Sequence, residues 1–102
     1  MLFSITLQYT RAAADIAPHL DAHRQWLVEY IKRGSIILAG PLEPRTGGLI
    51  LASCADMASM QAMMEQDPFI VEQVASYAAQ ACRPALVASG FPAGWAPDAN
   101  VV

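Results

Sequence analysis

The first segment of the chain alternates between apolar and polar side chains. Within residues 2–10, every second position is apolar or aromatic: Phe3, Ile5, Leu7 and Tyr9. The positions between them are polar, and a period of two places the two sets on opposite faces of an extended strand. The pattern therefore predicts a strand with one buried face and one more polar face.

From about Asp15 to Arg33 the period becomes that of a helix. The residues that recur at spacings of three and four are Ile16, Leu20, His23, Leu27 and Ile31. Gly34 follows two basic residues, which is typical of a helix C-terminus. We predict a single helix here, with His23 on its apolar stripe.

A hairpin is predicted next. Ser35–Leu42 is a short apolar strand that Gly40-Pro41 ends, residues 43–48 (EPRTGG) supply turn residues, and Leu49–Cys54 is the return strand.

A second helix is then predicted, with Asp56 as its N-cap. Its apolar stripe consists of Met57, Met60 and Met64. At this spacing, methionines are typical of core filling. Pro68 disfavours a helical conformation at Asp67, so this helix has to end there. After a short turn of helix, residues from about 77 to 87 form the last extended stretch.

The resulting order is β-α-β-β-α-β, which predicts a ferredoxin-like α+β sandwich with a four-stranded antiparallel sheet. We place this domain at residues 1–89. Residues 90–102 are rich in Pro, Gly and Ala and read as a C-terminal arm with Trp95 as an anchor. Two helices cover only one face of such a sheet, so we expect a second copy to cover the other, as a homodimer or higher homo-oligomer.

Composition narrows the function classes. The 102 residues are 55% hydrophobic and 15% charged, which indicates a packed globular chain. A net charge of −3 with only six basic residues argues against nucleic acid as a partner. No apolar run approaches the ~20 residues of a membrane span, and the N-terminus lacks a basic signal-peptide region, so we expect a cytoplasmic protein. Cys54 and Cys82 belong to no metal or redox motif, and we expect no cofactor.

His23 is the first candidate for chemistry. On a helix stripe it has two interpretations: a buried neutral imidazole that bonds to a carbonyl, or a general acid or base at the edge of the core. Helix context alone favours the first. His19 lies one turn earlier, and this spacing occurs in two-histidine metal sites. No third ligand accompanies it, so we predict no metal and expect His19 to face solvent.

Asp67 also has two interpretations, which the sequence leaves open. It can be the N-cap of a short helical turn that Pro68 begins, or a carboxylate held on a fixed backbone for chemistry. Gly40 and Pro41 can end a strand or let a ligand approach the backbone closely. Arg45 can belong only to the turn, or it can reach a ligand carboxylate.

Three motifs together resemble the YciI-like family: AHRQWL (residues 22–27), LAGPLEPRTGG (residues 38–48) and DPF (residues 67–69). The similarity covers about residues 1–86. It implies a ferredoxin-like dimeric α+β barrel in which His23 and Asp67 form a catalytic pair in a pocket. It also implies a small-molecule substrate, which we expect Gly40, Pro41, Arg45 and Phe69 to contact.

The resemblance implies a cofactor-independent lyase or isomerase that transfers a proton on a small organic acid. One departure favours an alternative, a non-catalytic ligand-binding or interaction module. Many relatives carry an arginine shortly before the helix histidine, where this chain has Leu20 and Asp21. Arg11 or Arg45 would have to replace it. A monooxygenase on the same fold is a third alternative, which rests on fold analogy alone.

Overall fold

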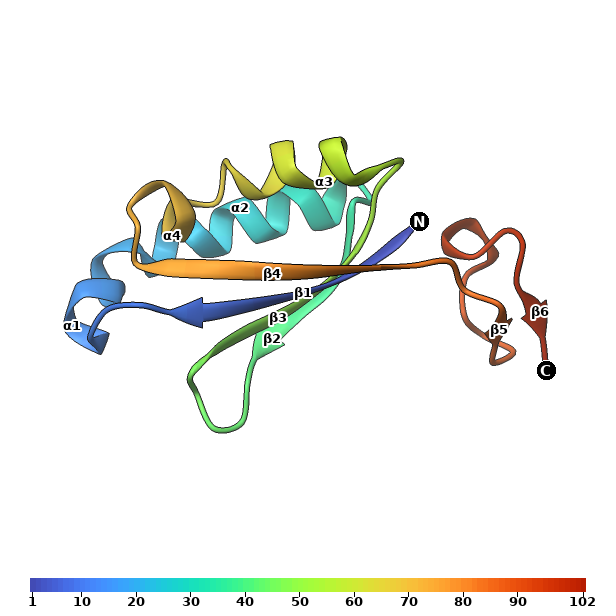
Figure 1. The fold of residues 1–102 in the computed structure, drawn as a ribbon, viewed down its shortest axis with the longest axis horizontal. Helices are drawn as coiled ribbons and strands as arrows, with labels where there is room; N and C mark the ends of the chain where they lie inside the picture. The colour runs from blue at the N-terminus through green and yellow to red at the C-terminus, as the bar shows by residue number, and fades with distance from the viewer.

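The computed structural model describes residues 1–102 and contains a four-stranded antiparallel sheet with helices on one face (Figure 1). Its strands are β1 (Leu2–Tyr9), β2 (Ile36–Pro41), β3 (Gly47–Ser53) and β4 (Ala75–Cys82). They lie in the order β2-β3-β1-β4, so the first strand is central and pairs with the third and fourth. This arrangement confirms the predicted ferredoxin-like α+β fold.

The central strand β1 carries the alternation seen in the sequence. Phe3 and Ile5 are fully buried and Leu7 nearly so, whereas Ser4 and Thr6 between them are exposed. Ile5 lies opposite Ile50 of β3 on one side and Ala79 of β4 on the other. The core therefore sits between this face of the sheet and the helices.

The predicted first helix is divided at its start. It consists of α1 (Ala13–Ile16), a short 3-10 turn η1 (Ala17–His19) and the main helix α2 (Leu20–Lys32). Pro18 lies in the first turn of η1. A proline has no N–H to donate and its ring crowds the preceding turn, which explains why one continuous helix does not run through this position. The prediction of a single helix from Asp15 was wrong here.

The buried stripe of α2 also differs from the predicted one. Its buried residues are His23, Trp26 and Tyr30. Leu20 and Ile31, which the sequence pattern places on the apolar stripe, are each 43% exposed. Spacings of three and four fit either stripe, and the one that buries two large aromatic side chains removes more apolar surface from water.

The second helix α3 (Met57–Met64) begins where the sequence predicted. The Asp56 carboxylate accepts a hydrogen bond of 2.8 Å from the Ser59 N–H, so Asp56 is its N-cap. The methionines that α3 buries are Met60, Met63 and Met64. Met57 is 42% exposed, so the predicted methionine stripe was wrong at its first position. A short helix α4 (Pro68–Val71) follows and leads into β4.

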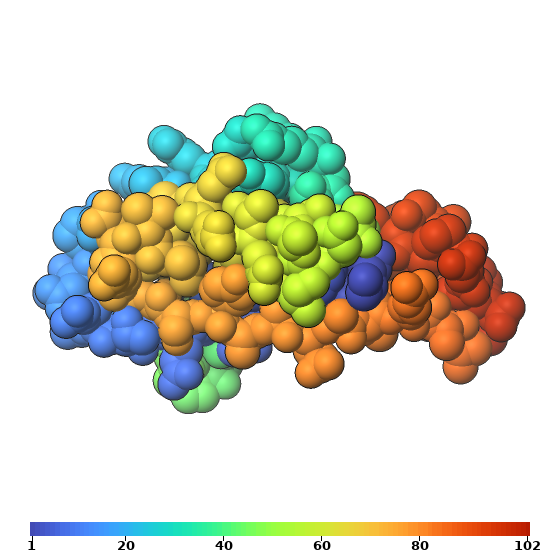
Figure 2. All heavy atoms as spheres, turned by 45° about the horizontal axis from the view of Figure 1, so that its top comes forward, coloured from blue at the N-terminus to red at the C-terminus, as the bar shows by residue number.

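Beyond β4, residues 83–102 extend past the sheet and include the C-terminal arm, residues 90–102. The expected last strand is interrupted: β4 ends at Cys82, and β5 (Leu86–Val87) follows Pro84. The arm contains a 3-10 turn η2 (Ala93–Trp95) and β6 (Asn100–Val101), which pairs in parallel with β5. The arm projects from the end of the sheet opposite α4 (Figures 1 and 2). None of the helices is long and apolar enough to cross a bilayer.

Candidate active site

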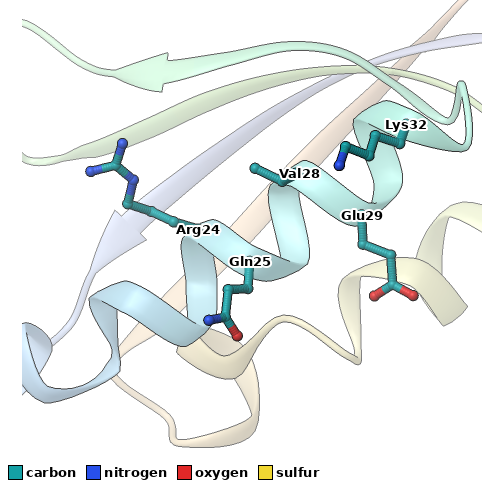
Figure 3. Close-up of a pocket in the computed structure, with 5 residues that line it drawn as sticks. All are labelled: Arg24, Gln25, Val28, Glu29 and Lys32. Atoms are coloured by element: carbon teal, nitrogen blue, oxygen red, sulfur yellow. The ribbon is translucent and has the colours of Figure 1, made fainter.

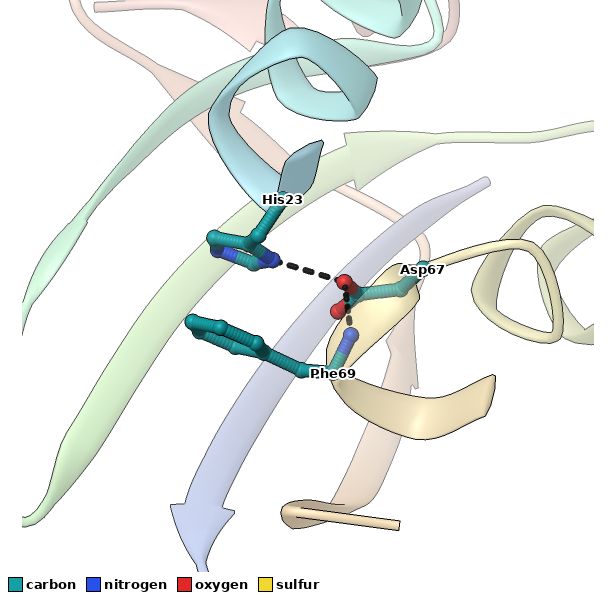
Figure 4. Close-up of polar contacts among 3 residues, drawn as sticks. All are labelled: His23, Asp67 and Phe69. Carbon is teal, nitrogen blue, oxygen red and sulfur yellow. Dashed lines mark hydrogen bonds and ion pairs between the residues drawn. The ribbon is translucent and has the colours of Figure 1, made fainter. Parts of the chain in front are cut away.

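The His23 imidazole and the Asp67 carboxylate meet beneath α2. The distance between His23 Nδ1 and Asp67 Oδ1 is 2.7 Å (Figure 4). Both residues are buried, His23 with 7% of its surface exposed and Asp67 with none. They are the only buried residues with polar or charged side chains outside the aromatic core. The structure thus brings together, over 44 positions of sequence, the two residues proposed as a catalytic pair.

Asp67 is also the N-cap of α4. Its backbone is extended, Pro68 occupies the start of the helix, and Oδ1 accepts a bond of 3.0 Å from the Phe69 N–H. The same oxygen therefore satisfies an orphan helix donor and contacts the imidazole. The two interpretations that the sequence left open are compatible, because one carboxylate serves as cap and as histidine partner.

Phe69 covers one face of the imidazole. The two rings are stacked with centroids 3.9 Å apart and planes inclined by 7° (Figure 4). The Tyr9 ring meets Phe69 edge-on at 6.0 Å. These contacts restrict the His23 side chain to one ring orientation among those that its rotamers would allow.

The hydrogen-bond network assigns the proton on the imidazole. A carboxylate only accepts, so Nδ1 carries the hydrogen that it donates to Asp67. In the neutral imidazole, Nε2 is then the nitrogen with a free lone pair. A histidine in this tautomer can take a proton at Nε2, while the carboxylate stabilises the positive charge that develops on the ring.

Sequence reasoning missed a second contact between the same two segments. Trp26 and Tyr30 continue the buried stripe of α2, and the Tyr30 hydroxyl donates a 3.0 Å hydrogen bond to Gln66 Oε1. Trp26 lies between the two contacts, with its ring centroid 5.9 Å from that of His23 and 5.7 Å from that of Tyr30. The spacing of three between His23 and Trp26 was the signal that could have placed both on one helix face.

The other residues proposed for substrate lie on the β2–β3 hairpin. Gly40 and Pro41 are the last residues of β2, and Arg45 is in the turn; all three are exposed. The turn reaches the end of β1, where the Tyr9 N–H donates to the Thr46 carbonyl at 3.0 Å. The hairpin turn is thus at the same end of the sheet as Tyr9 and Phe69, but no hydrogen bond joins Arg45 to His23 or Asp67.

Two hollows are open to solvent near the helices. One, of about 440 Å³, lies along the exposed side of α2 among Arg24, Gln25, Val28, Glu29 and Lys32 (Figure 3). The other, of about 380 Å³, lies between the end of α2 and α3 and is lined by residues that include Tyr30, Cys54 and Gln66. Neither is lined by His23 or Asp67.

Histidines and cysteines elsewhere in the chain are the other candidates for metal binding or nucleophilic chemistry. No group of three or more His, Cys, Asp or Glu residues is placed to hold a metal ion. His19 ends η1 and is half-buried, although we expected it to face solvent. Burial raises the pKa of the Cys54 thiol above its usual value, which keeps it protonated at neutral pH and makes it a weak nucleophile. The His23–Asp67 pair is the only buried contact between two ionisable side chains.

Comparison with known proteins agrees with this fold. A solved structure of 5-chloro-2-hydroxyhydroquinone dehydrochlorinase (TftG) from Burkholderia phenoliruptrix AC1100, in complex with 2,5-dihydroxybenzoquinone, superposes with a TM-score of 0.69. The alignment covers 82% of this chain and 95% of that one, at 18% sequence identity. No curated protein matches the sequence. The family model of the YCII-related domain matches residues 1–82, and the chain therefore belongs to the YCII-related family.

Proposed function

We propose that this protein is a cofactor-independent enzyme that transfers a proton on a small organic acid, as a lyase or an isomerase. The observation that carries the proposal is the buried contact of 2.7 Å between His23 Nδ1 and Asp67 Oδ1. Placing two ionisable groups in a protein interior is costly unless they are paired, and such pairs are frequent at functional sites.

The proposed roles follow from the tautomer. His23 Nε2 takes a proton from a carbon or hydroxyl of the substrate, and the imidazole becomes a cation. Asp67 holds the ring in place through Nδ1–H and stabilises that cation. In an isomerase His23 returns the proton to another atom of the substrate. In a lyase the electron pair expels a leaving group and the proton is lost to solvent.

The reaction class is proposed by analogy with the similar solved structure. Its name describes a dehydrochlorinase, in complex with 2,5-dihydroxybenzoquinone. Because the identity is 18%, this likeness establishes the fold only. For this chain we propose acidic small molecules as substrates, with the exposed hairpin residues Gly40, Pro41 and Arg45 and the stacked Phe69 around them.

The alternative is a small-ligand-binding or interaction module without catalysis. The limited access to His23 favours it, since its side chain is 9% exposed and neither described hollow includes it. The absence of an arginine at Leu20 or Asp21 favours it as well.

We further propose a homodimer that covers the open face of the sheet. This face contains the exposed polar residues Ser4 and Thr6 of β1 and the partly exposed apolar residues Leu38 and Leu49, which are 48% and 37% exposed. None of these residues is charged, so two such faces can meet without electrostatic repulsion. Light scattering coupled to size exclusion tests this proposal, and a stable monomer at micromolar concentration would contradict it. We place the protein in the cytoplasm, where both free cysteines would stay reduced.

A proton-exchange screen tests the enzymatic proposal. The protein is incubated in D2O with small carboxylic acids, hydroxy acids and hydroxyquinones, and deuterium uptake or elimination is followed by mass spectrometry and NMR. The matched control is His23→Gln, which keeps a polar side chain of similar size but cannot act as a base at neutral pH. We expect turnover in the wild type and none in the variant. Binding with no exchange or elimination would favour the non-catalytic module, and equal turnover by both proteins would refute the role of His23.

A further inference from the structure

Two buried side-chain polar atoms have no hydrogen-bond partner, namely Trp26 Nε1 and Asp67 Oδ2. One is a donor only, and the other, as a carboxylate oxygen, is an acceptor only. Asp67 is fully buried and Trp26 is 5% exposed. Figure 4 shows that both hydrogen bonds of the carboxylate end on its other oxygen, Oδ1. An orphaned buried polar atom is destabilising, and such atoms are uncommon in folded proteins.

The two orphaned atoms belong to facing segments. The stripe of α2 contacts the link between α3 and α4 twice, through His23 with Asp67 and through Tyr30 with Gln66. Trp26 lies between these contacts on the same stripe, flanked by both rings. Trp26 therefore lies on the stripe of α2 that contacts the Gln66–Asp67 segment, beside the residue that bonds to Asp67.

We propose that one buried water molecule bridges Trp26 Nε1 and Asp67 Oδ2, which makes Trp26 a positioning residue for the His23–Asp67 pair. A water molecule can accept from the indole N–H and donate to the carboxylate oxygen, so it satisfies both atoms. Buried waters in proteins commonly have this role. The bridge fixes the plane of the carboxylate from the side that His23 and the Phe69 N–H do not reach.

The kinetic consequence of this inference rests on the proposed function, but the bridge itself does not. With Oδ2 held, Oδ1 stays directed at His23 Nδ1 while the imidazole takes a proton and becomes charged. Without the bridge, the carboxylate can rotate and the imidazole loses part of its orientation. Residues that orient a catalytic histidine in this way act on the chemical step more than on substrate binding.

The test compares Trp26→Phe with Trp95→Phe. The first keeps an aromatic ring in the core but removes the N–H, and the second removes the indole of the arm as a matched control. The chain has two tryptophans, so the two variants assign the two indole N–H signals in the NMR spectrum. In the wild type we expect a nuclear Overhauser contact between the Trp26 indole proton and a long-lived water. A high-resolution crystal structure should show that water within about 3 Å of both atoms.

Two structural results would overturn the inference: ordered Trp26 and Asp67 side chains with no water between them, or a direct bond from the indole to another acceptor. Neither depends on a substrate, so they are independent of whether the proposed enzyme activity exists. If an activity is found, Trp26→Phe should lower kcat about fivefold with KM unchanged, as expected for one net hydrogen bond, while Trp95→Phe changes neither. A change confined to KM would contradict the positioning role.

Discussion

Asp56 and Asp67 begin two successive helices in the same way but in opposite surroundings. Asp56 accepts from the Ser59 N–H at 2.8 Å, and Asp67 accepts from the Phe69 N–H at 3.0 Å. Asp56 is exposed and has no further partner, whereas Asp67 is fully buried and also contacts His23. The comparison shows that a cap explains why an aspartate stands at a helix start, but not why one of the two is buried with a histidine.

The sharpest difference between the two aspartates should appear in stability. Asp67→Ala removes a cap and leaves His23 buried without its partner, so we expect the free energy of unfolding to fall by about 3 to 5 kcal/mol. Asp56→Ala removes only a solvent-exposed cap and should cost clearly less. Urea denaturation of both variants measures the difference. Equal losses would mean that the buried pair contributes nothing beyond capping.

A second comparison separates charge from capping. Asn can still accept from a backbone N–H at a helix start, so Asp67→Asn should keep the fold. It should nevertheless lower any proton-transfer activity by a factor of about a hundred, because the neutral amide cannot stabilise the imidazole cation. Asp56→Asn is the control and should retain full activity. Full activity in Asp67→Asn would show that only the cap matters.

A smaller loss of stability is expected when the phenyl ring of Phe69, next to the buried Asp67, is replaced. Phe69→Leu keeps an apolar side chain but removes the stacking on His23 at 3.9 Å. We expect a loss of about 1 to 2 kcal/mol in the free energy of unfolding. Val71→Ala, in the same short helix but 58% exposed, should change stability by less than about 0.5 kcal/mol. Similar losses in the two variants would mean that neither the burial of the phenyl ring nor its stacking on the imidazole contributes measurably to stability.

The smallest expected effect is on the pH dependence of the free energy of unfolding. Hydrogen bonds from Ser59 lower the pKa of Asp56 below its usual value. A depressed pKa in the folded state contributes stability above the unfolded value, about 3.9, and this contribution is lost as the pH falls through the lower folded value. The stability difference between the wild type and Asp56→Asn should therefore be constant from pH 7 to about pH 4 and change only below it. A change that begins near pH 6 would point to another group.

Most of the fold could be predicted from local sequence patterns. The alternation along β1 determined which side chains face the core, and the proline after Asp67 marked the end of a helix. The site could be predicted only in part, because the contact between His23 and Asp67 joins positions that no local spacing relates. The resemblance to a family supplied that link. On α2 the pattern was ambiguous, since Leu20 and Trp26 both fit a helical stripe and only packing against the sheet decides between them.

The stacking of Phe69 on His23 has a stereochemical consequence. One flat face of the ring is covered and Nδ1 contacts Asp67, so if His23 is the proposed base it would exchange protons through Nε2, in the plane of the ring. An enzyme with a single such base removes and returns hydrogen on the same side of its substrate. Isomerisation by this protein would then be suprafacial, and some of a deuterium label would move from the first carbon to the second before solvent could replace it.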